Sequence, residues 1–280
     1  MLKTFNKKKI AQIINKTGPN FLRHATDNEN TLTLAVDAFK KIKISDKDKS
    51  KIKNLIFVTE TPVYAFPGNA VIFSSILNLN KNINLFDLNA GCTGFVDSMK
   101  IASRMRGETL IVCSETYSKY FNKFNRSIST IFSDCASVFL YRKNMKLIDH
   151  ISGYEKNSHS SLIGYNKKEM NMDGGKVFNF ITSTVIPSLE KFIKKKEKKK
   201  INKIYIHQAS KIVIDTFKQK FNNYEFVFPS NLIKVGNTNA STIPLMLEED
   251  IKKKRIKDGD KVIMCGFGVG LSFSIALIEI

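Results

Sequence analysis

The chain has 280 residues, of which 42% are hydrophobic, so it can bury a sizeable core and its composition excludes a disordered chain. It carries 45 Lys and Arg against 25 Asp and Glu, a formal net charge of +20. No stretch approaches the roughly 18 uninterrupted apolar residues of a membrane-spanning helix, and the basic start of the chain is followed by no apolar signal segment. We therefore expect a cytoplasmic protein and no membrane span.

Short apolar runs rich in β-branched residues alternate with helical segments, which is the pattern of an α/β fold with a buried sheet. The first half predicts a strand at 54–59, a helix at 68–77, a strand at 84–89, a helix at 92–106, and strands at 109–114 and 136–141. The second half predicts a polar loop at 157–172, a helix at 176–195, a strand at 203–207, helices at 210–221 and 239–255, and strands at 261–265 and 271–279.

Both halves end in a pair of extended segments after a strand, helix and strand in alternation. This similarity predicts two related α/β units, residues 1–145 and residues 146–280. No linker rich in Pro, Gly or Ser separates them, so we expect the two units to share one packed body.

The charge excess raises the question of a nucleic-acid partner. The lysines stand in short runs at helix ends and in loops, and the chain has no zinc-finger spacing, no RNP-type aromatic motif and no recognition helix. We therefore interpret the basic surface as solvated and expect no nucleic-acid partner. Such a surface also suits an acidic protein partner or a phosphorylated ligand.

The four cysteines stand at positions 92, 113, 135 and 265, with no C-x-x-C pair and no histidine at metal-ligand spacing. This pattern indicates reduced thiols, with neither a disulfide framework nor a metal site. Cys113 and Cys265 lie within apolar strands, which is typical of a buried structural thiol.

Cys92 is the first candidate for chemistry. A predicted strand runs into small residues and delivers this cysteine to the first turn of a helix, where free backbone N–H groups and the helix dipole favour a thiolate. Gly91 and Gly94 leave room for a sharp turn and for an acyl group. The alternative is a buried cysteine that acts as a small hydrophobic residue.

His207 is the second candidate, because it ends a predicted strand just before a helix that Ser210 caps. Carboxyl ends of strands in α/β folds open toward the ligand crevice. A structural histidine with satisfied hydrogen bonds is the alternative.

Asn237 is the third candidate and stands among small polar residues that lead into a helix. Its amide can donate a hydrogen bond into a cavity, although an ordinary turn or cap residue is the alternative.

A glycine-rich segment at 266–270 lies between two predicted strands and includes Gly268 and Val269. It looks like part of a dinucleotide-binding motif, but no helix follows it, so that interpretation fails. A glycine-rich turn that lines a pocket fits better.

Taken together and in this order, these motifs resemble the thiolase-fold condensing enzymes, most closely the 3-oxoacyl-acyl carrier protein synthase III family. The likeness covers nearly the whole chain. The matching segments are Lys16-Thr17-Gly18, Ala65-Phe66-Pro67, Asn89-Ala90-Gly91-Cys92-Thr93-Gly94-Phe95, Asn125-Arg126-Ser127, Phe132-Ser133-Asp134, His207-Gln208-Ala209, Gly236-Asn237-Thr238, and Arg255-Ile256-Lys257-Asp258-Gly259-Asp260.

The resemblance implies a thiolase-like fold and a catalytic set of Cys92, His207 and Asn237. Cys92 would accept the acyl group, and His207 and Asn237 would donate hydrogen bonds to the enolate left when a malonyl thioester loses carbon dioxide. The backbone N–H of Cys92 and one from the 267–270 turn would hold the oxyanion of the acyl step.

Other family positions imply substrate contacts. Phe178, Phe267, Gly268 and Val269 match the acyl pocket and its turn, and Arg126 matches a coenzyme A contact. Phe66 matches a residue that crosses a dimer interface into the partner's acyl pocket, so the resemblance implies a homodimer. Acyl carrier proteins are acidic, so we expect the exposed lysines after His207 to dock one. These are Lys211, Lys218 and Lys220.

The sequence also departs from the family pattern. An N-terminal strand that family members carry before the helix at 7–16 is absent, and no Trp is available for the coenzyme A adenine. Lys16 stands where Arg is usual, and Val269 replaces the middle glycine of a Phe-Gly-Gly-Gly run. These departures affect the expected acyl donor more than the nucleophile.

The leading interpretation is a decarboxylating condensing enzyme that joins an acyl group from coenzyme A to malonyl-acyl carrier protein and so starts fatty-acid synthesis. Acetyl-coenzyme A is the expected acyl donor, and no cofactor is expected beyond the thioester substrates. One alternative is an acyltransferase or condensing enzyme of specialised metabolism or surface-sugar acylation that uses the same cysteine. A second is a basic binding protein on a degenerate scaffold, against which the retention of Cys92, His207 and Asn237 argues.

Overall fold

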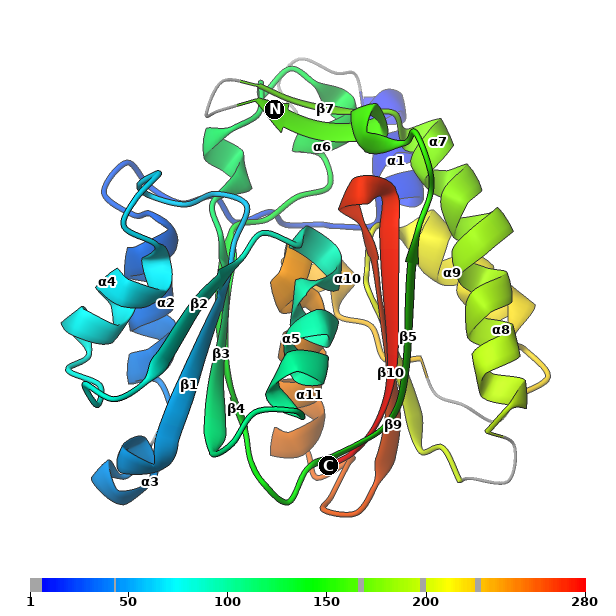
Figure 1. Ribbon diagram of the computed structural model, residues 1–280. Coiled ribbons are helices and arrows are strands. Elements are labelled where there is room, and N and C mark those ends of the chain that lie inside the picture. The colour runs from blue at the N-terminus through cyan, green and yellow to red at the C-terminus, as the bar shows by residue number, and fades with distance from the viewer. Residues whose placement is uncertain (1–6, 43, 166–168, 197–199, 225–227) are drawn as a thin grey trace.

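Two four-stranded sheets form the frame of the protein in the computed structural model, which describes residues 7–42, 44–165, 169–196, 200–224 and 228–280 (Figure 1). The first sheet has the order β2-β1-β3-β4. β1 pairs in parallel with β2 and β3, and β3 pairs antiparallel with β4. The bounds are β1 Ile52–Val58, β2 Asn84–Leu88, β3 Glu108–Glu115 and β4 Cys135–Tyr141.

The second sheet has the order β5-β10-β9-β8. β8 pairs in parallel with β9, and β10 pairs antiparallel with both β5 and β9. The bounds are β5 Lys146–Tyr154, β8 Lys203–Ile206, β9 Lys261–Gly268 and β10 Ser272–Glu279. A separate hairpin joins β6 Leu162–Tyr165 to β7 Glu169–Met172.

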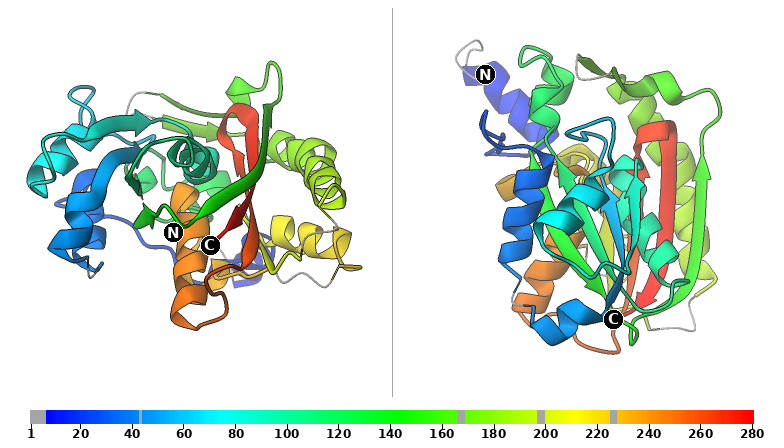
Figure 2. Two further views of the ribbon diagram at one scale, coloured as in Figure 1. Left: turned by 60° about the horizontal axis from the view of Figure 1, so that its bottom comes forward. Right: turned by 60° about the vertical axis from the view of Figure 1, so that its left-hand side comes forward.

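Helices α5 (Gly94–Ala102) and α11 (Thr242–Lys252) lie between the two sheets, and the other long helices cover the outer faces (Figures 1 and 2). α2 (Thr31–Lys40) and α4 (Asn69–Ile76) cover the first sheet, whereas α8 (Ile186–Lys194) and α9 (Lys211–Lys220) cover the second. The helices between the sheets are apolar on both sides, because they pack against strands of both. The chain is therefore layered as helix, sheet, helix, sheet and helix.

Shorter elements complete the described chain. α1 (Lys7–Thr17) begins the chain but packs against α9, which belongs to its second half. The remaining helices are α3 Asp46–Lys51, α6 Arg126–Ser129, α7 Gly174–Phe180 and α10 Leu232–Val235. The short helical turns are η2 Gly91–Thr93, η3 Tyr117–Lys119, η4 His159–Ser161, η5 Ile181–Val185, η6 Asn239–Ser241 and η7 Val269–Leu271.

Most predicted elements are confirmed within one or two residues, but several predictions were wrong. The segment predicted as a polar loop at 157–172 contains the hairpin of β6 and β7. The helix predicted to end at 106 ends at Ala102, and Gly107, with φ of 86°, leads the chain into β3. β9 continues through Gly268, so the predicted glycine-rich turn begins inside a strand. β5 was not predicted, because polar side chains interrupt its apolar pattern.

The division into residues 1–145 and 146–280 stays a prediction. Its support is that the strands of one sheet end at Tyr141 and those of the other begin at Lys146. The first strand of the described chain is β1. None of the helices in the described ranges has the length and apolar character that crossing a bilayer requires.

A buried ionic cluster ties β8 to α11. The Asp250 carboxylate is fully buried and accepts hydrogen bonds from Lys203 Nζ at 2.5 Å, Tyr205 OH at 2.7 Å and Arg255 Nε at 2.6 Å. Burial alone would raise the pKa of Asp250, but these three donors outweigh it and lower the pKa below its ordinary value. The cluster therefore stabilises the folded chain when Asp250 is ionised.

Replacing this carboxylate should destabilise the protein at neutral pH. We expect Asp250→Asn to lower the free energy of unfolding by about 3 kcal/mol, because it leaves the Lys203 ammonium buried without its counter-charge. Urea unfolding at pH 7 measures this loss. The stabilisation from a carboxyl with a lowered folded pKa is fully present above its ordinary value of 3.8 and is lost as the pH falls through the folded pKa, so the difference between variant and wild type should shrink below pH 3.8.

The exposed Asp258→Asn is the matched control and should change the unfolding free energy by less than about 0.5 kcal/mol. Equal stability of Asp250→Asn and Asp258→Asn at neutral pH would contradict the role given to the cluster.

Candidate active site

Cys92 lies in the tight turn η2, between the carboxyl end of β2 and the start of α5. Gly91 allows this turn, because its φ of 46° lies in the left-handed region that favours glycine. The Cys92 side chain is 5% exposed, and its Sγ donates a hydrogen bond to Asn239 Oδ1 at 2.9 Å. The sulfur is thus placed at the strand end, inside the molecule.

The end of β9 passes directly over Cys92. A Cβ on Gly268 would lie 2.8 Å from Cys92 Sγ, and a Cβ on Gly266 would lie 2.7 Å from the Cys92 carbonyl oxygen. Glycine is required at both positions, because any side chain there would occupy the space of the cysteine. Val269 follows without a strained backbone, since the positive φ values of this turn fall on its glycine neighbours, 159° at Gly268 and 129° at Gly270.

His207 follows β8 and is held by its backbone N–H, which donates to the Cys265 carbonyl oxygen at 2.8 Å. Its ring is 1% exposed and meets Phe267 edge to face, with the ring centroids 5.5 Å apart. Its Nδ1 is buried without a hydrogen-bond partner among the described residues. Burial lowers the pKa of His207 to about 3, so the imidazole is neutral at physiological pH.

Asn237 is fixed by its backbone beside the loop after α6. Its N–H donates to Ile131 O at 2.9 Å, and its carbonyl oxygen accepts from the Ser133 N–H at 2.8 Å. Its side-chain Oδ1 accepts from the Asn239 N–H at 2.9 Å, which leaves Nδ2 with one long contact of 3.5 Å to Ala209 O. The amide N–H groups are therefore oriented but weakly engaged.

A cavity of about 570 Å³ brings these three residues together, although they come from distant parts of the sequence. Its wall includes the predicted pocket residues Phe178, Phe267 and Gly268. Its edge includes Lys16 and Ser127, whose side chains are exposed.

The other predicted site residues lie outside this cavity. Val269 lines a neighbouring cavity of about 310 Å³. Arg126 is exposed on α6, beside the cavity residue Ser127. Phe66 stands on the loop before α4, 86% exposed, and lines neither cavity. The three lysines Lys211, Lys218 and Lys220 lie exposed on α9.

The sequence indicated that the start of the helix favours a Cys92 thiolate, but the surroundings of the sulfur act against it. Burial raises the pKa of the Cys92 thiol well above its usual range, and the Glu60 carboxylate raises it further. Hydrogen bonds from the backbone N–H groups of Val269 and Cys92 oppose this rise and are outweighed. Cys92 is thus a neutral thiol at rest, because desolvation exceeds the effect of a short helical turn.

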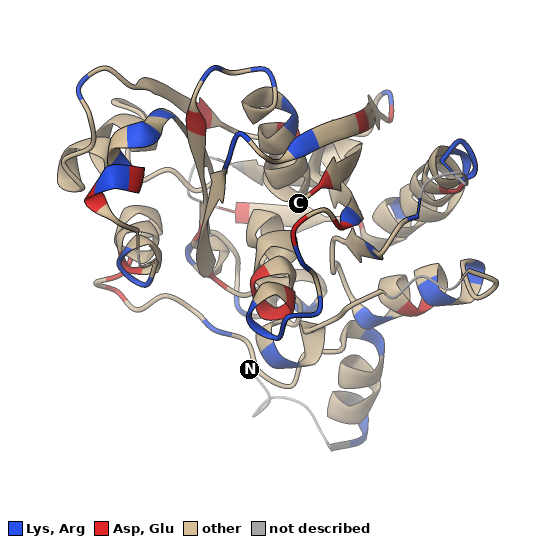
Figure 3. Cartoon of the chain, turned by 90° about the horizontal axis from the view of Figure 1, so that it is seen from below, with Lys and Arg blue, Asp and Glu red and all other residues tan. Residues whose placement is uncertain are grey.

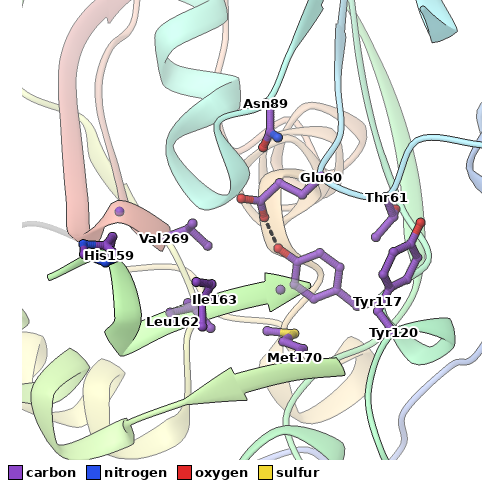
Figure 4. Close-up of a pocket in the computed structure, with 12 residues that line it drawn as sticks. Glu60, Thr61, Asn89, Tyr117, Tyr120, His159, Leu162, Ile163, Met170 and Val269 are labelled. Carbon is purple, nitrogen blue, oxygen red and sulfur yellow. Dashed lines mark hydrogen bonds between the residues drawn. The ribbon is translucent and has the colours of Figure 1, made fainter. Parts of the chain in front are cut away.

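Glu60 is a site residue that sequence reasoning missed. It follows β1 and faces the smaller cavity, where Tyr117 donates a hydrogen bond to its Oε2 (Figure 4). A Cβ on Gly91 would lie 2.7 Å from that oxygen, so the carboxyl sits beside the residue before Cys92. A charged residue directly after a buried strand was the available signal.

Asn239 was also missed as a site residue. Its side chain accepts the Cys92 hydrogen bond, its φ is 55°, and its amide also acts on Glu60, where it opposes the rise in pKa that burial causes. Across the described ranges, no three His, Cys, Asp or Glu side chains are grouped to hold a metal ion. The chemistry of the site therefore rests on a thiol, amides, an imidazole and carboxyl groups.

Comparisons with known proteins match this chain to one family. The model described as 3-oxoacyl-[acyl-carrier-protein] synthase III matches residues 86–155, and the model of its C-terminal part matches residues 194–280. The beta-ketoacyl-[acyl-carrier-protein] synthase III of Clostridium perfringens is 31% identical, over 92% of this chain and 87% of that protein.

Solved structures agree in fold. The beta-ketoacyl-[acyl carrier protein] synthase III of Thermus thermophilus is 23% identical with a TM-score of 0.88 and covers 100% of this chain and 93% of that one. The priming beta-ketosynthase of the R1128 polyketide pathway is 21% identical with a TM-score of 0.85 and covers 96% of this chain and 87% of that one. These likenesses confirm the predicted fold class.

Removing the Glu60 charge should make Cys92 more reactive. We expect Glu60→Gln to raise the rate of Cys92 alkylation by iodoacetamide at least about threefold at pH 9, because a lower thiol pKa increases the thiolate fraction. The increase should be smaller at pH 6, where Glu60 is less ionised. Peptide mass spectrometry over time measures the rate, with the buried Cys113 and Cys265 as internal references.

Glu108→Gln is the matched control, because Glu108 is a buried glutamate at the start of β3 and lines neither cavity. Slower or unchanged alkylation in Glu60→Gln would contradict the electrostatic coupling between Glu60 and Cys92.

Proposed function

The chain belongs to the 3-oxoacyl-[acyl-carrier-protein] synthase III family, and we propose that it condenses an acyl group with malonyl-acyl carrier protein through an acyl-Cys92 intermediate. It is a condensing acyltransferase that fits the initiating step of fatty-acid synthesis. The observation that carries the proposed chemistry is the convergence of Cys92, His207 and Asn237 on one buried cavity. We take acetyl-coenzyme A as the first acyl donor to test.

In the first step, Cys92 Sγ attacks the carbonyl carbon of an acyl-coenzyme A thioester. A new carbon–sulfur bond forms, the bond to coenzyme A breaks, and coenzyme A leaves as a thiol that carries the proton lost by Cys92. The backbone N–H groups of Val269 and Cys92 already lie within hydrogen-bond reach of Sγ. They are therefore placed to hold the oxyanion that develops beside it, a stabilisation worth about 3 kcal/mol for one donor.

In the second step, the malonyl thioester loses its carboxylate as carbon dioxide, and the electron pair of the broken bond forms an enolate. His207 and Asn237 donate hydrogen bonds to the enolate oxygen. A pKa of about 3 keeps His207 neutral, so it offers an N–H dipole and no charge. The enolate carbon then attacks the acyl carbonyl, the carbon–sulfur bond to Cys92 breaks, and the thiolate takes up a proton.

The larger cavity is the proposed channel for the thioester arm. Its edge carries Lys16, and Arg126 is exposed nearby, so cationic side chains stand where the phosphates of coenzyme A or of a carrier protein would lie. Its wall carries apolar residues such as Phe178, which suit an extended chain. No cofactor beyond the thioester substrates is required by these steps.

A homodimer is the proposed assembly, and the cytoplasm is the proposed location. The support for the dimer is Phe66, a phenylalanine that is 86% exposed on a loop and lacks burial within its own chain. In a dimer this ring would be covered and would reach the partner's acyl site.

Transfer of the acyl group to an oxygen or nitrogen nucleophile is the alternative reaction. It would use Cys92 in the same way but would need no enolate donors. The weakly engaged Nδ2 of Asn237 favours condensation, because a free amide donor is what the enolate oxygen requires.

An Asn237 variant should separate the two steps. We expect Asn237→Ala to slow the discharge of acyl-Cys92 by malonyl-acyl carrier protein about a hundredfold, because one enolate donor is lost. Acylation of Cys92 by acetyl-coenzyme A should change little. Rapid quenching followed by intact mass spectrometry measures both rates, and Cys92→Ala should give no adduct.

The exposed Asn179→Ala is the control for general damage. If Asn237→Ala discharges acyl-Cys92 at the wild-type rate, the condensing role given to Asn237 fails, and acyl transfer without condensation becomes the better proposal.

Helix α9 is the proposed docking site for the carrier protein. Its first turn contributes Ile212 and Val213 to the cavity wall, so a carrier bound there could deliver its thioester arm. Lys218 is exposed, whereas Lys220 pairs with Glu190 at 3.3 Å and Lys211 pairs with Asp215 at 2.5 Å. Basic residues are spread over many elements, so charge alone does not single out this helix (Figure 3).

Reversing charge on α9 should weaken the carrier interaction. We expect the double variant Lys218→Glu and Lys220→Glu to raise KM for malonyl-acyl carrier protein about tenfold at low ionic strength without lowering kcat, because steering by opposite charge is lost. Added salt should reduce the difference. The same exchange at Lys252 and Lys253, at the C-terminal end of α11, is the control. Equal effects of the two double variants would count against docking on α9.

A further inference from the structure

A second cavity, of about 310 Å³, lies next to the first. Leu162 lines both cavities, and the two neighbours Gly268 and Val269 each line one of them. Val269 also approaches Cys92 Sγ with its backbone N–H. A group bonded to Cys92 can therefore extend into the second cavity, while the thioester arm that delivered it occupies the first.

Polar side chains line one side of this second cavity (Figure 4). Glu60 and Tyr117 point toward each other and share a hydrogen bond, and Tyr120 stands beside Tyr117. The opposite side is mostly apolar and includes Leu162, Ile163 and Met170, with His159 at its far end. An acyl chain in this space would thus meet a carboxyl and a phenol on one side and hydrocarbon on the other.

Glu60 is backed by a second carboxyl group. Glu115 is 1% exposed and accepts hydrogen bonds from the Glu60 N–H at 2.8 Å and from Thr61 Oγ1 at 2.7 Å. Burial raises the pKa of Glu60, and burial together with the nearby Glu60 charge raises the pKa of Glu115. Glu115 is buried and Glu60 is partly buried beside it, and two adjacent carboxyl groups with little access to water do not both ionise readily. Glu60 is therefore able to donate as well as accept a hydrogen bond.

An unsubstituted alkyl chain is a poor occupant of such a space. It would displace water from the Glu60 carboxyl and offer no hydrogen bond in return, which is costly for a polar group that the chain then covers. A hydroxyl group on the chain replaces the lost water, because it both donates and accepts. Sites that hydrogen-bond a substrate hydroxyl discriminate strongly against the analogue that lacks it.

We propose that the second cavity holds the acyl group on Cys92, an inference that rests on the proposed function. Within this cavity, Glu60 and Tyr117 select a short acyl chain that bears a hydroxyl group near the thioester. The place of the hydroxyl follows from Glu60, whose Oε2 would lie 2.7 Å from a Cβ on Gly91, the residue before the nucleophile. The acylation itself is an ordinary thioester exchange, in which coenzyme A leaves as a thiol and nothing is oxidised or reduced.

The test compares two thioesters of equal chain length. Butyryl-coenzyme A and 3-hydroxybutyryl-coenzyme A are incubated separately with the protein, and the rate of Cys92 acylation is followed by intact mass spectrometry. We expect the wild type to react at least about tenfold faster with the hydroxylated thioester. In Glu60→Leu the two rates should become equal within about twofold, because the hydrogen-bonding group is gone.

The ratio of the two rates is measured within one protein sample, so it does not depend on how much of a variant is folded. Tyr117→Phe keeps the shape of the ring and removes the bond to Glu60, so its ratio should fall between those of the wild type and Glu60→Leu. Glu108→Gln, a buried glutamate outside both cavities, should keep the wild-type ratio.

The outcomes separate this inference from the proposed function. Acylation by butyryl-coenzyme A at an equal or higher rate, or a ratio unchanged in Glu60→Leu, overturns the hydroxyl selection and leaves the condensing function intact. Failure of both thioesters and of acetyl-coenzyme A to acylate Cys92 overturns the proposed coenzyme A donor, and the selection with it.

Discussion

The structure depends on how closely two distant segments, the one with Asn239 and the end of β9, approach the sulfur of Cys92. The turn η2 presents the sulfur, Asn239 accepts its hydrogen bond, and the end of β9 covers it. Gly266 and Gly268 permit this approach, because a Cβ at either position would overlap Cys92. The two sheets and the helices between them hold these segments in place and thereby bury the thiol of Cys92.

Enclosure decides the protonation of the site. Burial keeps His207 neutral and Cys92 a thiol. It also raises the pKa of Glu60, which favours the protonated carboxyl. The groups around the sulfur therefore act through fixed dipoles, which need little rearrangement when charge develops. The proposed mechanism follows from this state, because an acyl thioester and a developing enolate are stabilised by N–H donors without a competing positive charge.

The sequence predicted the strands, the outer helices and the positions of Cys92, His207 and Asn237, because apolar periodicity and strand ends are local features. It failed where distant contacts decide the outcome. The thiolate that the helical turn was expected to favour is disfavoured at rest, since burial and Glu60, which lies 32 residues earlier in the chain, outweigh the turn. Asn239 was predicted only as the first residue of a helix, and its bond to Cys92 exists only once η6 packs against η2. The roles of the three predicted residues stay predictions.

The most direct test of the account follows one acyl group through a single turnover. The wild-type protein is loaded with a labelled acetyl group, mixed with malonyl-acyl carrier protein and quenched at intervals, and the label is located on Cys92 and on the carrier by mass spectrometry. The account predicts that the label leaves Cys92 at the same rate as a 3-oxoacyl carrier appears and carbon dioxide is released. Label that never resides on Cys92, or that leaves it without a condensed product, would contradict the account.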